Sequence, residues 1–592
     1  MDNRKNNNKF SNFYLLFLTL KLSLLTICLL FIGCVGIDVL PLSAQQVDPI
    51  RIPNPIPLPE PTPPPVPPLL PPQLPPPEEL LQPPTTAPKP QEEPPLGVPE
   101  TIRVERFKFE GNTAFSEKEL AEVTKAFVGK DLTFAELLQA RSAVTKHYID
   151  AGYITSGAFI PPQTLEGETV TIQVVEGELE GIEVKGTNRL RAEYVSSRLA
   201  RAARKPLNVN RLLEALQVLQ LNPLIKNLSA ELSAGSRPGS SLLEVTISEA
   251  DSFDIQLRAD NGRTPSVGSF RRQVEVREDN LLGFGDAVSL AFTNTDGSNE
   301  WVFNYTVPFN SRNGTVNFSF SRTSSQIIEP PFDQVDIEAK SRNFEVSIRQ
   351  PLIQTPTQEL AVGLTGTRRE SDTTLLNTPF PLSPGANELG QTRVTALRFF
   401  QEWTQRDSQQ VFAARSQFSI GLGWRATVND EPPDSRFFGW RGQVQWLRQL
   451  APDTLLLLRG DMQLATRALL PLEQFGLGGL ESVRGYRQDS VLSDNGVFAS
   501  AELRLPIYRL PRQQGVLQVT PFLDFGTAWN SSGKEAPENN MLLSLGLGLR
   551  LQLGERFTAR LDYGIPLIHV PSGDRTWQEN GLYFSLVGSP FD

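Results

Sequence analysis

Few side chains in this sequence could do catalytic chemistry, and they are scattered. Only two histidines, His147 and His569, are present, and neither has a serine or aspartate at a spacing typical of a catalytic triad. No G-x-S-x-G nucleophile motif and no phosphate-binding P-loop occur. Both cysteines, Cys28 and Cys34, lie in an apolar stretch near the N-terminus, so a chain without that stretch has no thiol. We therefore expect no enzyme, no cofactor and no metal site.

Two other segments combine glycine with a charged side chain. Residues 476–486 read Gly-Leu-Gly-Gly-Leu-Glu-Ser-Val-Arg-Gly-Tyr and contain Arg484, and residues 522–526 read Phe-Leu-Asp-Phe-Gly around Asp524. On a strand, Val519, Leu523 and Phe525 share one apolar face. Asp524 then points to the opposite, polar face.

Residues 251–592 have the alternating pattern of many β-strands. In segments of about ten residues, apolar side chains such as Val288, Leu290 and Phe292 alternate with polar or small ones, which gives each strand one apolar face. A soluble sandwich would also alternate. The number of segments and the charges on their polar faces favour lipid outside and water inside, hence a transmembrane antiparallel β-barrel. These charges are Arg349, Arg425, Arg550, Arg560 and Asp562.

Prolines close several of these segments, at Pro308, Pro351, Pro506 and Pro566. Proline lacks the N–H that a strand ladder needs, so it predicts strand ends, and we place all four at the short periplasmic turns. The polar stretches 371–392 and 429–436 are expected to be longer extracellular loops.

Two tandem units precede the barrel, in residues 101–177 and 178–250. The first has an alternating strand up to Gly111, a helix capped by Ser116 and Glu119, a helix over residues 134–151 and two further strands. The second repeats this β-α-α-β-β order, with helices over residues 192–203 and 209–221, and residues 182–187 match residues 107–112 in pattern. Such a repeat describes organisation rather than catalysis.

The N-terminal hundred residues contain no predicted domain. Residues 1–44 have a basic start, an apolar run and a small-residue cleavage site, which predicts a signal peptide; an uncleaved anchor and a lipoprotein acylated at Cys34 are the alternatives. Residues 45–100 are so rich in proline that helix and sheet are excluded, which predicts an extended periplasmic linker that buries no core. The net charge of −10 argues against binding of nucleic acid.

The glycine-rich motifs resemble those of the BamA-like outer-membrane assembly and secretion barrels. In that superfamily, the Val-Arg-Gly-Tyr signature lies on a loop folded into the lumen, and the resemblance implies that Arg484 pairs with Asp524. The alternative is an ordinary hairpin whose arginine faces water. The residues that carry the resemblance are Gly479, Val483, Arg484, Gly485 and Tyr486 in the loop, Asp524 and Gly526 in the strand, and Asn280, Gly283, Gly285 and Asp286 in an early barrel turn.

The two tandem units resemble POTRA domains, and two of them before a barrel resemble the two-partner secretion transporters (TpsB, of the ShlB/FhaC/HecB type). This resemblance implies a barrel of sixteen strands, which residues 251–592 accommodate at roughly twenty residues per strand and turn. These transporters often carry a pore-plugging helix before the first POTRA domain. Here the proline stretch, where only residues 78–81 could begin a helical turn, makes that helix doubtful.

The resemblance also implies the partners. The POTRA domains would bind an unfolded, β-helical exoprotein (TpsA-like) by β-augmentation, and the barrel would export it without ATP. Outer-membrane lipid would surround the barrel, and periplasmic chaperones and the barrel-assembly machinery would act during biogenesis. A BamA-type insertase, a solute porin and a barrel enzyme are the alternatives, but a porin explains neither the tandem repeats nor the Arg484 motif.

Overall fold

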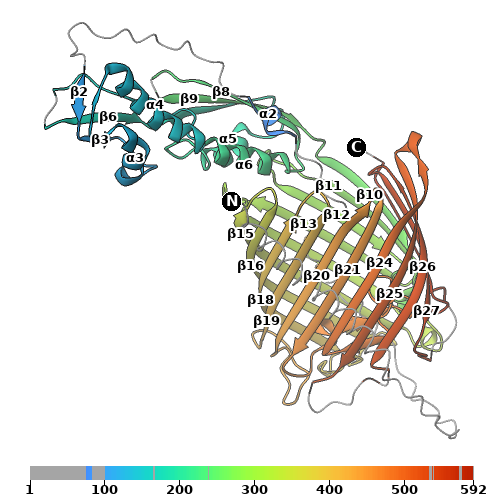
Figure 1. Cartoon of the computed structure of the whole chain (residues 1–592). Coiled ribbons are helices and arrows are strands. Elements are labelled where there is room, and N and C mark those ends of the chain that lie inside the picture. The colour runs from blue at the N-terminus through green and yellow to red at the C-terminus, as the bar shows by residue number, and fades with distance from the viewer. Residues whose placement is uncertain are drawn as a thin grey trace, which may run out of the picture. The chain divides into compact units, whose positions relative to one another are not determined.

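The computed structural model describes residues 75–82, 101–164, 167–237, 239–531, 537, 539–571 and 576–590. The predicted signal peptide lies outside these residues, as do residues 45–74 and 83–100 of the predicted linker. The described chain forms two small α/β domains followed by a closed β-barrel (Figure 1). No helix among the described residues is both long enough and apolar enough to cross a membrane.

The first α/β domain packs two helices against a small sheet. Strand β6 (Thr169–Val175) lies between β3 (Arg106–Glu110) and β5 (Gly157–Phe159), while β2 (Ile102–Val104) pairs with β4 (Lys130–Leu132). The predicted capping box of Ser116 and Glu119 begins α3 (Glu117–Thr124), and a second one begins α4 (Phe134–Asp150). Alternate strand residues and one face of each helix form the core.

The second domain repeats this order with a wider sheet. It contains β7 (Glu178–Lys185), α5 (Ala192–Ala200), α6 (Val209–Gln220), β8 (Ile225–Ala234) and β9 (Ser240–Glu249). Helix α5 ends three residues before the predicted Ala203. The sheet order is β1-β8-β9-β7, in which β1 comes from the proline-rich stretch.

The proline-rich stretch contains a helical turn where the sequence allowed one, at residues 78–81, and also a strand and buried residues that the sequence did not predict. Residues Pro77–Leu80 form the helical turn α2, and Leu81–Gln82 form β1. Leu80 is fully buried and Leu81 nearly so, both in the core of the second domain. The prediction that this stretch excludes helix and sheet and buries no core is wrong for residues 77–82. The reason is local: Pro77 stands at the first turn of a helix, where proline fits, and the next five residues contain no proline.

The two domains have the same hydrogen-bond arrangement at matching positions. In each domain, a glutamate at or just after the end of the last strand accepts backbone N–H groups from the turn that follows the first long strand. Glu176 accepts from Thr113 at 2.6 Å and Ala114 at 2.7 Å, and Glu249 accepts from Leu190 at 3.0 Å. A carboxylate that binds otherwise unpaired N–H groups fixes the chain between the first strand and the first helix.

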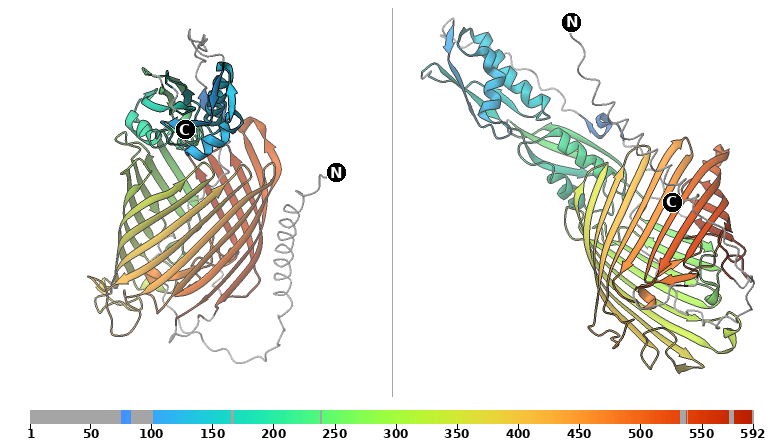
Figure 2. Two further views of the ribbon diagram at one scale, coloured as in Figure 1. Left: turned by 60° about the vertical axis from the view of Figure 1, so that its left-hand side comes forward. Right: turned by 60° about the horizontal axis from the view of Figure 1, so that its bottom comes forward.

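The barrel is a single closed antiparallel sheet whose tilted strands are visible in Figures 1 and 2. The described residues contain sixteen long strands, as predicted, and β17 (Thr378–Pro379) adds a short hairpin beside β16. Pairing of residues 257–260 of β10 with residues 585–588 of β28 closes the barrel. The long strands are β10 (Phe253–Asp260), β11 (Arg271–Glu278), β12 (Ala287–Asn294), β13 (Ser298–Pro308), β14 (Thr315–Gln326), β15 (Ile337–Gln354), β16 (Gln358–Leu375), β18 (Gln391–Arg406), β19 (Gln410–Leu422), β20 (Phe438–Ala451), β21 (Thr454–Ala465), β24 (Asn495–Leu510), β25 (Gly515–Trp529), β26 (Met541–Leu553), β27 (Phe557–Pro566) and β28 (Leu582–Gly588).

The barrel wall is apolar outside and polar inside. Leu545, Leu547 and Leu549 are about half exposed on the outer face of β26, and polar or small side chains alternate with them toward the lumen. Of the charges predicted on the polar face, Arg425 is misplaced. Strand β19 ends at Leu422, and Arg425 lies exposed in the following loop with a positive φ of 51°.

Two details of the predicted strand ends also need correction. Pro308 ends β13, and a register shift beside Pro351 and Pro506 marks the same, periplasmic end of β15 and β24. Pro566, however, ends β27, which runs the opposite way, so it lies at the extracellular end. A proline marks a strand end but not which end. The predicted loop 371–392 is shorter than expected, because β16 continues to Leu375 and β18 begins at Gln391.

The carboxylate of Glu176 makes the fold of the first domain pH-dependent. Burial raises the pKa of Glu176, but hydrogen bonds from Thr113, Ala114 and Tyr148 outweigh burial and hold the pKa below its ordinary value of 4.5. The stabilisation is therefore complete above about pH 4.5 and is lost as the pH falls through the lower folded-state value.

We expect Glu176→Gln to destabilise the first domain by about 2 kcal/mol, because the amide replaces a charged acceptor of several N–H and O–H groups. Hydrogen exchange of the full chain at pH 7, read by mass spectrometry, should be roughly thirtyfold faster in peptides from residues 102–177. The matched control Glu249→Gln should accelerate exchange only in residues 178–250. Unchanged exchange in the first domain of the Glu176 variant would contradict the proposed role of this carboxylate.

Candidate functional site

The long connection between β21 and β24, residues 466–494, folds into the barrel lumen. It contains a two-stranded ribbon, β22 (Phe475–Leu477) and β23 (Val491–Ser493). Its apolar side chains form a small core of their own with the inner wall of β24 to β26. That core comprises Phe475, Leu477, Val483, Tyr486, Val491, Phe498, Ala528 and Leu542.

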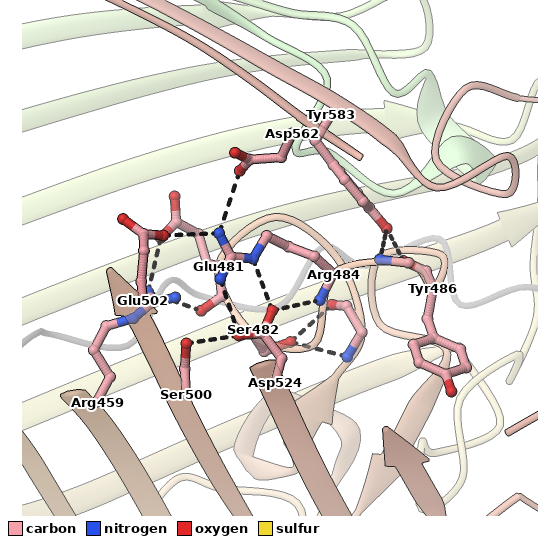
Figure 3. Close-up of polar contacts among 12 residues, drawn as sticks. Arg459, Glu481, Ser482, Arg484, Tyr486, Ser500, Glu502, Asp524, Asp562 and Tyr583 are labelled. Atoms are coloured by element: carbon pink, nitrogen blue, oxygen red, sulfur yellow. Dashed lines mark hydrogen bonds and ion pairs between the residues drawn. The ribbon is translucent and has the colours of Figure 1, made fainter. Parts of the chain in front are cut away.

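Arg484 lies at the tip of this loop and is fully buried (Figure 3). Its Nε donates to Oδ2 of Asp524 at 2.7 Å and its Nη2 to Oδ1 at 2.9 Å, which is the bidentate geometry of a strong Arg–carboxylate pair. The backbone N–H of Arg484 also donates to Asp524, at 3.2 Å. Nη1 donates to Glu502 at 2.8 Å and to Asp562 at 3.4 Å. The loop is thus bound to β25, β24 and β27 by one side chain.

Ion pairs connect the carboxylates around Arg484 to further arginines. Arg560 lies 3.0 Å from Glu502 and 2.6 Å from Asp562, and Arg504 lies 3.0 Å from Glu502. Arg484 is thus one of several cations that share these carboxylates. The Arg484 guanidinium also lies over the ring of Phe522, 3.4 Å from its centroid, so one face of the cation contacts an aromatic ring rather than water.

Glycines allow the loop to approach the wall this closely. Gly485 has a φ of 95°, and a Cβ on Gly564 of β27 would lie 2.6 Å from the Gly485 nitrogen. That nitrogen donates to the Tyr583 hydroxyl at 3.1 Å. A Cβ on Gly526 would lie 2.9 Å from Val483 of the loop. Larger residues at these positions would push the loop away from Asp524.

Tyr486 holds the far side of the same loop. Its hydroxyl donates to a carbonyl of Leu543 or Ile568, at 2.8 and 2.9 Å, and accepts N–H groups from the same two residues. Gly479, with a φ of 99°, forms the turn that brings its N–H to the Val483 carbonyl at 3.1 Å. The four other predicted loop residues therefore all take part in placing Arg484.

A second anchor holds the loop to the opposite wall. The Glu473 side chain is only 6% exposed and its two oxygens accept from Nη2 of Arg398 at 2.8 and 2.9 Å. Nη1 of Arg369 donates to the same carboxylate at 3.0 Å and to the Leu472 carbonyl at 2.9 Å. Arg369 belongs to β16 and Arg398 to β18, so the loop spans the lumen between two clusters of buried charge.

The predicted early turn lies at the periplasmic end, between β11 and β12. Asp286 is fully buried and accepts the Leu282 N–H at 2.9 Å. The side chain of Asn280 accepts the Gly285 N–H at 3.0 Å. The Gly283 carbonyl accepts the N–H of Arg191, just before α5, at 2.9 Å. This turn is therefore a docking point for the second α/β domain and makes no contact with the Arg484 cluster.

The structure thus brings together the two predicted loop and strand motifs and leaves the turn motif separate. Sequence reasoning missed Glu502 and Phe522 as partners of Arg484, although strand alternation places both on the inner face. No sequence pattern indicated the role of Glu473. It lies in an irregular loop, where side chains do not alternate between two faces, so the direction of its side chain cannot be predicted from its position. Among the described residues, no group of three or more His, Cys, Asp or Glu side chains is arranged to hold a metal ion.

Comparison with known proteins adds three findings. The family model described as haemolysin secretion/activation protein ShlB/FhaC/HecB matches residues 239–551, more than half of the chain, and the model described as POTRA domain, ShlB-type, matches residues 102–177. The heme/hemopexin transporter protein HuxB of Haemophilus influenzae (strain 86-028NP) is 22% identical over 465 residues, which cover 76% of this chain and 80% of that protein.

Two solved structures share the fold. The structure of CdiB from Escherichia coli matches with a TM-score of 0.64 and 21% identity, over 85% of this chain and 92% of that one. The crystal structure of BamA from Haemophilus ducreyi lacking POTRA domains 1–3 matches with a TM-score of 0.50 and 15% identity, over 83% of this chain and 100% of that one.

We expect Glu473→Gln to release the loop from β16 and β18, because the neutral amide removes the carboxylate that both Arg369 and Arg398 bind. Conductance of the purified protein in planar lipid bilayers should then rise at least about twofold, with more frequent openings. The matched control is Glu481→Gln on the same loop, whose side chain is 69% exposed. Equal conductance of the two variants would contradict an anchoring role for Glu473.

Proposed function

The chain belongs to the haemolysin secretion/activation family ShlB/FhaC/HecB, and we propose on this basis that it captures an unfolded exoprotein in the periplasm and threads it outward through its lumen. It is an outer-membrane transporter of two-partner secretion, with POTRA domains before a closed barrel. The observation that best supports the threading step is the loop braced across a polar lumen between Arg484 and Glu473.

The lumen suits a hydrated polypeptide rather than an apolar solute. A polar cavity of about 330 Å³ lies between the inner faces of β11 to β16 and Leu472 of the loop. Arginine, glutamate, serine and threonine side chains dominate its lining, and these offer hydrogen bonds of many geometries. An extended chain with exposed backbone N–H and C=O groups could exchange partners there as it moves.

Passage of a polypeptide requires the loop to move, since it crosses the space that the client must use. Releasing Arg484 would separate a fully buried cation from Asp524, its bidentate partner, which costs several kcal/mol. Releasing Glu473 separates it from Arg369 and Arg398, whose side chains are 17% and 8% exposed, so water can reach this anchor more readily than the fully buried Arg484. We infer that the loop swings about the Arg484 cluster and that the Glu473 side opens.

Recognition falls to the POTRA domains, which offer strand edges to an extended partner. Main-chain hydrogen bonds of a β-augmenting segment are largely independent of sequence, so side chains in the adjoining grooves must select the client. We propose that the client is a secreted, β-helical exoprotein, that periplasmic chaperones keep it unfolded, and that the barrel-assembly machinery inserts the transporter itself.

The proposed role needs no catalytic group and no nucleotide. A domain that folds outside the cell gains about 5–15 kcal/mol, and a folded domain cannot slide back through the lumen. We therefore infer that the chain is not an enzyme and that folding of the client gives export its direction.

Arg484→Ala is expected to reduce export at least about tenfold while the barrel still folds, because the loop loses its bond to three strands. Export is measured as client in the culture medium, and folding as heat-modifiable mobility in gel electrophoresis. Arg425→Ala, in an exposed loop, is the matched control and should export normally. Asp524→Ala should reproduce the defect, and the double variant should be no worse than either single variant. Normal export by the Arg484 variant would refute the role of the loop.

Deletion of the gene distinguishes a dedicated exporter from an insertase of the BamA type. We expect one protein to disappear from the culture medium while the outer-membrane proteome stays unchanged, because a two-partner transporter serves one client. Quantitative mass spectrometry of both fractions measures this. Depletion of many outer-membrane proteins would instead support the insertase alternative.

A further inference from the structure

The second POTRA domain already holds a short extended segment against its edge strand. Strand β1 pairs in parallel with β8, with Leu81 opposite Ala230 and Gln82 opposite Glu231. The helical turn α2 contacts both β8 and α6 (Figure 1), so the segment fills the groove between that strand and that helix. Leu80 is fully buried and Leu81 is 9% exposed. Their cluster includes Leu212, Leu216 and Leu219 of α6 and Leu228, Ala230 and Leu232 of β8.

This occupant uses only a small part of the available edge. Strand β8 has ten residues, and the described residues pair with only two of them on the β1 side. The remaining N–H and C=O groups on that side form a template for another strand. A longer extended segment could form more backbone hydrogen bonds than β1 and still place two aliphatic side chains where Leu80 and Leu81 lie.

The first POTRA domain offers a poorer template. Its equivalent edge strand, β5, has three residues and is followed closely by Pro161 and Pro162, which lack backbone N–H groups. The sheet order β3-β6-β5 leaves this edge without a further strand among the described residues. The longer edge with an apolar groove belongs to the second domain.

We propose that the groove between β8 and α6 is a binding site for an extended segment of the exoprotein that carries two adjacent aliphatic side chains, and that residues 77–82 occupy it as a self-ligand until the client displaces them. This inference rests on the proposed function, since it names the client subsite of the POTRA domains. Because the self-ligand belongs to the same chain, its effective concentration at the groove is high. It pairs with β8 through only two residues, so a client can still displace it.

A disulfide lock tests displacement. Gln82 and Glu231 are paired residues on neighbouring strands, whose Cα atoms lie about 4.8 Å apart in such a ladder, within the range of a disulfide. Gln82→Cys/Glu231→Cys should therefore cross-link in the oxidising periplasm, and peptide mass spectrometry verifies the bond. The single variant Glu231→Cys is the matched control.

We expect the locked transporter to export at least tenfold less of the protein that gene deletion removes from the medium, and a reductant to restore export. Equal export by the locked and control variants overturns the proposal but leaves the transport function intact. If gene deletion removes no secreted protein, the proposed function itself fails, and the peptide measurement below decides whether the groove exchanges its ligand.

The second measurement uses the purified full chain and a fluorescent peptide of residues 75–82. Leu80→Asp/Leu81→Asp should empty the groove, so this variant should bind the peptide at least tenfold more tightly than the unaltered chain, and the locked variant should bind it least. Equal affinities for all three proteins overturn the proposal, because the peptide would then bind elsewhere or the groove would not exchange its occupant.

Discussion

A guanidinium withdrawn completely from water needs hydrogen-bonding partners in fixed positions, and Arg484 sets this constraint on the inner wall of the barrel. The desolvation penalty of each ion in a buried pair is several kcal/mol. Here Asp524 binds the cation in bidentate fashion, Glu502 and Asp562 take the remaining side, and Phe522 covers one face. Three strands must therefore present these groups at one height, and glycines at positions 485, 526 and 564 must leave room for the loop.

Glu473 attaches the same loop to a second part of the barrel wall. With Arg484 bound to β24, β25 and β27 and Glu473 bound to β16 and β18, the loop joins opposite walls of the lumen. Arg487 of the same loop adds ion pairs with Glu329 and Glu579, outside these two clusters. The Arg484 cluster is the most completely buried of these attachments.

The sequence predicted best where a strong period exists. Strand alternation predicted the barrel and the inward direction of Asp524, because each strand residue has a definite face. The number of sixteen strands came from the family resemblance. It failed for Arg425, where the strand had already ended, and for Pro566, because a proline marks an end without a direction. Glu473 lies in a loop without a period, and its partners Arg369 and Arg398 lie 104 and 75 residues upstream, respectively. No local pattern predicts such a pair. The burial of Leu80 and Leu81 was not predicted, because the high proline content of the whole stretch was given more weight than the five consecutive residues without proline.

Strand edges are paired in the barrel but open in the POTRA domains, and this difference has a functional consequence. Closure of β10 on β28, through residues 257–260 and 585–588, pairs the two end strands, so the wall presents little strand edge with which a passing polypeptide could pair. The POTRA sheets are open, and their edges can capture a client by its backbone. Backbone capture is strong enough to hold an unfolded chain but does not distinguish one chain from another. Residues of the chain itself cover the edge of β8. A client must therefore bind this groove more tightly than Leu80 and Leu81 do before it can displace them. Specificity can then arise from competition in the groove, while the lumen accepts whatever the groove releases.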